Sequence, residues 1–127
     1  MSAEFVKSNL TNRRDILRIT TRDDAISMKD IENGTEIAVK AYVVQNITRD
    51  RGEYADGEVF QSIMVLSDDG KVYATRSDTF IEKLQDIMSE LADAGENVED
   101  LENEPLVIRI TKQKSSKGNQ FVSCSLA

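Results

Sequence analysis

The sequence predicts a mainly β domain with five short strands and one helix, the helix lying between the third and fourth strands. Three observations support this fold class. Five segments beyond residue 33 are rich in β-branched residues, one intervening segment repeats apolar residues at helical spacing, and turn residues separate the segments. The 127 residues suit a single domain. We divide it into an N-terminal extension over residues 1–33 and a barrel domain over residues 34–127.

The N-terminal extension gives weaker signals than the rest of the chain. Residues 15–21 are compatible with a strand, and Ser27 is a suitable cap for one helical turn over residues 27–31. Phe5 is expected either to anchor the terminus or to lie in a disordered end. The arginines of this region either extend a basic path or form a solvated arm: Arg13, Arg14 and Arg18.

Alternation and turn residues predict the first three strands. Residues 36–47 alternate in polarity, and their expected inner face holds Ile37, Val39, Ala41 and Val43. A polar loop then leads to a second strand over residues 59–66, which is largely apolar on both faces. Asp69-Gly70 is a strong hairpin signal, and it introduces a third strand over residues 71–76.

The remaining elements are one helix and two strands. Apolar residues spaced for an amphipathic helix begin at Phe80 and end at Leu91, with Ser77, Asp78 and Thr79 as candidate N-caps and Gly95 as the stop. An acidic connector over residues 96–104 precedes Pro105, where a strand can begin, and strands follow over residues 106–111 and 121–126. This succession is the order of the five-stranded Greek-key barrel of the OB type. Several folds share five strands and a helix, so the order does not settle the fold by itself.

A family resemblance adds to this reading. The first strand carries an aromatic residue expected to be exposed, an S-D-T-F turn enters the helix, and the last hairpin reads K-x-K-S-S-K-G-N-Q-F. In these features residues 34–127 resemble the small single-stranded DNA-binding proteins of bacteriophages and bacteria. The resemblance implies an OB-type fold and single-stranded DNA as ligand. Bacterial housekeeping members carry a Gly/Pro-rich tail with an acidic tip, which this sequence lacks, so we do not expect partner recruitment through such a tip.

The net charge of −7 by itself disfavours a nucleic-acid ligand. The charge is unevenly distributed, however. Residues 82–104 contain nine acidic residues and one lysine. After Glu104 the sequence has no acidic residue but has Arg109, Lys112, Lys114 and Lys117. Because the local field decides what a groove attracts, the basic hairpin is a candidate contact for phosphates.

A single-strand interface needs cations for the phosphates and flat side chains that stack on unpaired bases. In OB-type barrels it lies on strands two and three, between the first-to-second and fourth-to-fifth strand loops. Alternation directs the side chains of Tyr42, Tyr73 and Phe121 outward. The side of Phe60 is ambiguous, because its strand is largely apolar on both faces. The predicted nucleic-acid-binding residues are Lys40, Tyr42, Arg49, Arg51, Tyr54, Phe60, Tyr73, Arg76, Lys112, Lys114, Lys117 and Phe121.

Each of these residues also has a plain structural interpretation. An outward tyrosine often packs across strands, a loop lysine is often only solvated, and a lysine on an edge strand prevents aggregation. The prediction therefore depends on three outward aromatics and a basic hairpin occurring together on the expected surface. Cys124 is expected to be a small core residue.

The residue types that catalysis needs are scarce. The chain has no histidine, its one cysteine is expected to face inward, and it has no glycine-rich phosphate loop and no zinc-ligand cluster. The acidic pairs Asp23-Asp24 and Asp68-Asp69 do not have the spacing of a calcium loop. We therefore expect a non-enzymatic protein without cofactor or metal.

The leading hypothesis is sequence-tolerant binding and protection of single-stranded DNA in replication or recombination. Expected partners are single-stranded DNA or RNA, further copies of the chain and replication proteins, but no membrane. No signal peptide or long apolar stretch is visible, so we expect the cytoplasm of a bacterial or phage-infected cell. The alternative is a protein-interaction module, a barrel whose acidic helix meets a protein partner and which does not bind nucleic acid. Salt-dependent binding of a single strand separates the two.

Overall fold

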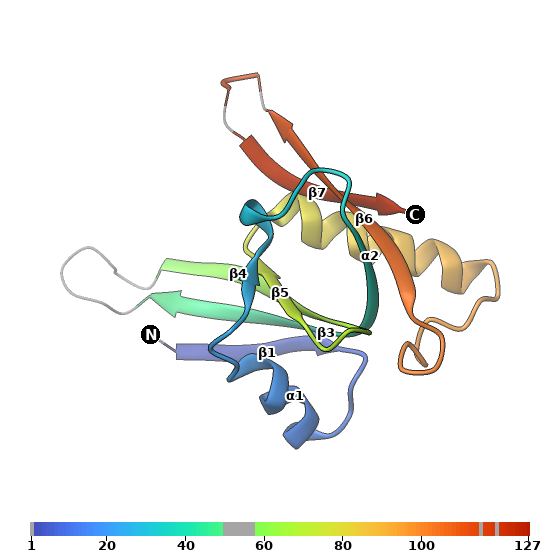
Figure 1. Ribbon diagram of the computed structural model, residues 1–127. Coiled ribbons are helices and arrows are strands. Elements are labelled where there is room, and N and C mark those ends of the chain that lie inside the picture. Colours follow the sequence, from blue (N-terminus) through green and yellow to red (C-terminus); the bar gives the residue numbers. More distant parts are fainter. Residues whose placement is uncertain (1, 50–57, 115, 119) are drawn as a thin grey trace.

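A computed structural model describes residues 2–49, 58–114, 116–118 and 120–127. In these residues a strongly curled sheet of seven strands is accompanied by two α-helices (Figure 1). The strands are β1 (Ser2–Ser8), β2 (Ile26–Ser27), β3 (Glu36–Arg49), β4 (Glu58–Ser67), β5 (Val72–Thr75), β6 (Leu106–Lys114) and β7 (Gln120–Leu126). The helices are α1 (Arg13–Thr20) and α2 (Asp78–Asp93), with a short 3-10 turn, η1 (Met28–Asp30).

The predicted mainly β class is confirmed, but five strands and one helix are too few. The five expected strands correspond to β3 to β7, and the expected helix is α2. The additional elements all lie in residues 1–33. Residues 15–21 do not form a strand, because Asn12 caps a helix by accepting a hydrogen bond from the Arg14 amide at 2.8 Å. Ile16 and Ile19, one turn apart, are the buried residues of that helix.

The sheet follows the order β2-β5-β4-β3-β6-β7, and β1 pairs with β3 beside this path. One side of β3 pairs with β4, while its other side pairs first with β6 and then with β1. The N-terminal residues thus contribute β1 and β2 to the same sheet as the rest of the chain.

The main core lies on the inner face of the curled sheet. A register shift between Val39 and Ala41 bulges β3, so the alternation changes phase there. Ile37 and Val39 lie in the main core as expected, but Tyr42 and Val44 follow them in place of Ala41 and Val43. Asn9 binds the backbone at the bulge through the Lys40 carbonyl at 3.1 Å and the Tyr42 amide at 2.9 Å.

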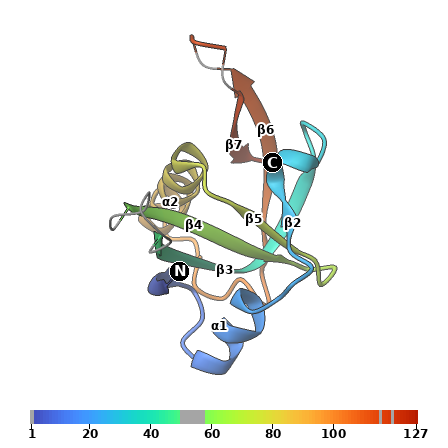
Figure 2. The same cartoon turned by 90° about the vertical axis from the view of Figure 1, so that its left-hand side faces the viewer.

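The outer face of the sheet is covered in part by α1. Ala41, Val43 and Val72 form a second buried cluster with Ile16 and Ile19 of that helix. Figure 2 shows α1 and α2 on opposite sides of β3 and β4. Because α2 lies on the other side of the sheet, the part of the outer face that α1 does not reach is covered by neither helix.

Helix α2 closes one end of the main core with Phe80, Ile81, Leu84 and Met88. Of the three candidate caps, Ser77 is the N-cap, because its hydroxyl accepts from the Phe80 amide at 3.3 Å. Gly95, with φ of 88°, follows the helix as expected. Cys124 packs in the same core, and burial raises the pKa of its thiol to about 11. A neutral, buried thiol is unreactive.

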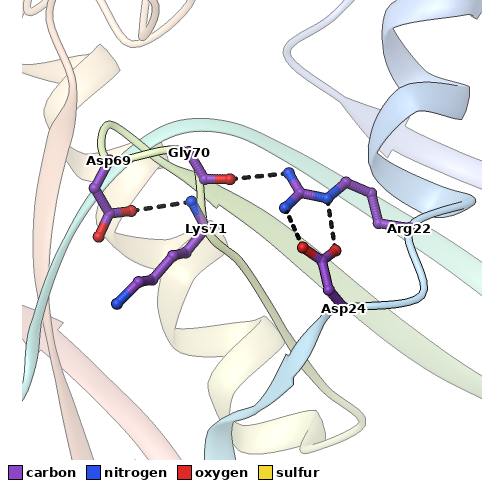
Figure 3. Close-up of polar contacts among 5 residues, drawn as sticks. All are labelled: Arg22, Asp24, Asp69, Gly70 and Lys71. Carbon is purple, nitrogen blue, oxygen red and sulfur yellow. Dashed lines mark hydrogen bonds and ion pairs between the residues drawn. The ribbon is translucent and has the colours of Figure 1, made fainter.

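Arg22 fixes the chain between α1 and β2. Its guanidinium donates to both carboxylate oxygens of Asp24, at 2.8 and 2.7 Å, and to the Gly70 carbonyl at 2.9 Å (Figure 3). Gly70 lies in the β4–β5 turn, so this contact helps to hold β2 parallel to β5. Across the described parts of the chain, no helix is both long and apolar enough to cross a membrane.

Candidate nucleic-acid interface

An open cavity of about 710 Å³ lies between β5 and β7. In the described residues these two strands do not pair with each other. The Ser77 hydroxyl bridges the opening by donating to the Val122 carbonyl at 2.5 Å. The lining residues are Ala25, Ser27, Lys29, Ser62, Ala74, Thr75, Arg76, Ser77, Asp78, Thr79, Gln120, Phe121 and Val122.

One aromatic and one cationic side chain of the predicted set line this cavity. Phe121, at the start of β7, is half-buried, and Arg76, just beyond β5, is exposed. The Arg76 guanidinium lies 4.8 Å from the centre of the Phe60 ring, so Phe60 borders the same site from β4. A guanidinium over a ring is held in place while its donors remain free for a phosphate.

The electrostatics of the cavity are mixed but locally favourable to phosphates. Its charged lining residues are Lys29, Arg76 and Asp78. Within the part of the chain that is described, neither cation is in an ion pair. Helix α2 also begins at the cavity, and the N-terminal end of a helix carries a partial positive charge.

The basic hairpin approaches the site from β6. The Lys112 ammonium donates to the Lys29 carbonyl at 2.7 Å, and the Lys112 amide donates to the Asn33 side chain at 2.9 Å. Lys114 ends β6 and Lys117 lies in the turn beyond it, and both are exposed. The hairpin is thus tied to η1 at its base while its outer lysines remain in solvent.

Two of the expected outward aromatics are buried instead. Tyr42 is 4% exposed and Tyr73 is 8% exposed, and both belong to the main core. They face Val65 from either side, since Val65 pairs with Tyr42 on β3 and with Tyr73 on β5. Burial, and to a lesser degree the charge of Glu99, raises the pKa of Tyr42. The expected exposure of both tyrosines is therefore wrong, and neither can stack on a base without leaving the core.

The remaining predicted residues divide into two groups. Lys40 lies by a separate, smaller cavity next to α1, together with Arg18, Arg22 and Glu102. The side chain of Arg49 and the whole of Arg51 and Tyr54 lie outside the described residues.

Several cavity residues were not predicted from the sequence. Lys29 and Ser27 reach the site because β2 pairs with β5, and Ser62, Thr79 and Gln120 line it from other elements. Small polar residues of this kind are common in loops and strand ends, so no local signal marks them. Only the three-dimensional pairing places them together.

A curled β-sheet with an open cavity bordered by aromatic and cationic side chains has the features of an oligonucleotide-binding protein. The comparison with known families agrees. The family model described as phage single-stranded DNA-binding protein, of the Phi29 phage type, matches residues 10–127. The chain belongs to this family, a family of DNA-binding proteins rather than enzymes. No curated protein matches the chain, and no solved structure does.

Proposed function

We propose that this protein binds single-stranded DNA without strong sequence preference and protects it during replication or recombination in the phage-infected cell. Family membership supports the ligand class. The observation that supports the mechanism is the joint position of Phe121, Arg76 and Phe60 around one open cavity. A base stacks on the Phe121 ring, and Lys29 and Arg76, the latter held over the Phe60 ring, contact phosphates.

The sheet topology supports an OB-type arrangement. Strands β3 to β7 pair in the order β5-β4-β3-β6-β7, with α2 between β5 and β6. The OB barrel is a partly open Greek-key barrel whose ligand lies on its second and third strands between two loops. Here the corresponding strands are β4 and β5, which carry Phe60 and lead to Arg76.

The absence of strong sequence preference follows from the kind of groups available. Every base offers a flat face to a phenylalanine ring, and a guanidinium or ammonium contacts any phosphate. Apart from Asp78, no acidic residue of α2 or of the following connector is among the lining residues of the cavity, so we propose that these other acidic residues do not contact the strand.

The experiment is fluorescence anisotropy with a labelled thymine oligonucleotide at several salt concentrations, with the matched duplex as comparison. We expect salt-sensitive binding to the single strand and much weaker binding to the duplex. Arg76→Gln should lower the slope of log affinity against log salt by about 0.7, the value for one phosphate contact on a single strand.

Lys83→Gln is the matched control, because it removes the same charge from an exposed position in the acidic part of α2. The control should leave the slope unchanged. Equal salt slopes for wild type and Arg76→Gln would show that Arg76 does not contact a phosphate. A wild-type protein that binds no single strand at low salt would overturn the proposed function and favour a protein partner.

A further inference from the structure

We infer that the bound strand continues from the cavity across β4 and β3 to a second nucleotide subsite at Phe5 and Arg13. This inference rests on the proposed function and extends it, because it assigns the N-terminal segment a direct role in holding DNA. The occupant is the next nucleotides of the same strand.

The first observation is continuity between two cavities. A second cavity of about 460 Å³ lies against α1 and β1 on the outer face of the sheet. It shares Ser62 and Ala74 with the cavity between β5 and β7. A strand that leaves the first cavity over these two small side chains therefore enters the second without crossing a covered surface.

The second observation is the register of the sheet. Phe5 pairs with Gln45 on β3, and Gln45 pairs with Ser62 on β4. Directly paired residues project from the same face of a sheet, so these three side chains form one row over a distance of about 10 Å. In the neighbouring row Ile47 pairs with Phe60, whose ring lies beneath Arg76. The row thus leads from β1 to the edge of the first cavity.

The third observation is the chemistry of the second cavity. Phe5 is 43% exposed, which leaves a ring face free for a base. Among the described residues, Arg13 is the only charged one that lines this cavity, so no carboxylate of that described lining opposes a phosphate. The nearest acid along α1, Asp15, is paired with Arg18 at 2.9 Å. Thr20 and Gln45 add hydrogen-bond donors, whereas the Thr21 hydroxyl already donates to the Leu17 carbonyl.

Charge and continuity together favour nucleotides over a protein segment as the occupant. An arginine that has no ion pair among the described residues, in one cavity with an exposed aromatic ring, is a combination suited to binding a single strand. The first cavity offers the same combination in Phe121 and Arg76. The structure therefore repeats one binding unit at both ends of a shared surface.

Two neighbouring pairs of residues allow matched tests on the full chain. Arg13→Gln removes the arginine that lines the second cavity, while Arg14→Gln removes an exposed arginine of the same helical turn that lines neither the first nor the second cavity. Phe5→Ala and Val6→Ala form the second pair, since Val6 is similarly exposed at 42% but lies outside the cavity. Circular dichroism melting curves confirm that each variant is folded.

The measurement is affinity for thymine oligonucleotides of about 3 and about 16 nucleotides, because three nucleotides at about 3.4 Å each are too short to fill the first cavity and also reach Phe5. Arg13→Gln and Phe5→Ala should each weaken binding of the long oligonucleotide by about fivefold or more, and should leave the short one unchanged. Arg14→Gln and Val6→Ala should match wild type with both.

Three outcomes would overturn the inference. Unchanged affinity of Arg13→Gln and Phe5→Ala for both lengths would leave this surface to a protein partner or a second copy. An equal loss for both lengths would place these residues in the first cavity or in the fold itself. An equal loss in Arg14→Gln would show a general charge effect. Failure of the proposed function is distinguishable, because it removes the effect of Arg76→Gln on the short oligonucleotide as well.

Discussion

Replacing Phe121 with alanine is expected to weaken binding of a thymine oligonucleotide by about 5- to 150-fold. The reason is that the Phe121 ring lines the cavity between β5 and β7, and stacking one base on an aromatic ring is worth about 1–3 kcal/mol. Because the ring is only half-buried, its loss should cost little stability. The affinity is measured by fluorescence anisotropy at constant salt.

Two further variants identify stacking as the cause. Phe121→Trp keeps a flat ring at the same position and should retain most of the affinity. Leu126→Ala removes an exposed apolar side chain, 49% exposed, from the other end of β7 and should have no effect. Normal binding by Phe121→Ala would show that the bases do not stack at this cavity.

Replacing Tyr42 or Tyr73 with alanine is expected to lower the free energy of unfolding by about 3–5 kcal/mol. Both rings are buried in the main core, and truncating a buried aromatic side chain leaves a cavity that the surroundings fill only in part. A domain of this size is stable by about 5–15 kcal/mol, so either variant should lose a large share of its stability. Urea unfolding followed by circular dichroism measures the change.

Conservative variants of the two tyrosines test whether their rings lie in the core, as in the structure, or on the binding surface, as strict alternation predicts. Tyr42→Phe and Tyr73→Phe keep the rings and should cost less than about 1.5 kcal/mol. Their DNA affinity should equal that of wild type, because neither hydroxyl reaches the proposed interface. A Tyr73→Ala protein with full stability and lost DNA binding would contradict the buried position and restore Tyr73 to the binding surface.

Elements with a strong local pattern could be predicted from the sequence. The stripe from Phe80 to Leu91 marked α2, and Asp69-Gly70 marked the β4–β5 hairpin, because both signals are confined to a few neighbouring residues. Residues 15–21 were expected to be compatible with a strand because they contain β-branched residues, but Ile16 and Ile19 also fit one face of a helix, and the structure has α1 there. The Asn12 cap and the packing of Ile16 and Ile19 against Ala41 and Val43 together favour the helix.

The candidate site was predictable only in part, because a bulge in β3 and the pairing of β2 with β5 depend on contacts between residues far apart in the sequence. Strict alternation predicted that Tyr42 points outward. The bulge at Lys40 moves each later residue of β3 to the opposite face of the sheet. No local signal reports such a bulge, which Asn9 stabilises from a distant part of the chain. Likewise Lys29 reaches the cavity through the parallel pairing of β2 with β5, a contact between residues far apart in sequence.

The most direct test of the central claim is a map of amide chemical shifts in nuclear magnetic resonance spectra as a thymine oligonucleotide is added. We predict that the shifted amides cluster around the first cavity and the row that continues from it, at residues 27–29, 60–62, 74–79 and 120–122. Amides of the acidic connector at residues 96–104 should stay in place. Shifts concentrated on α2 and the connector, with the cavity unchanged, would contradict the proposed interface.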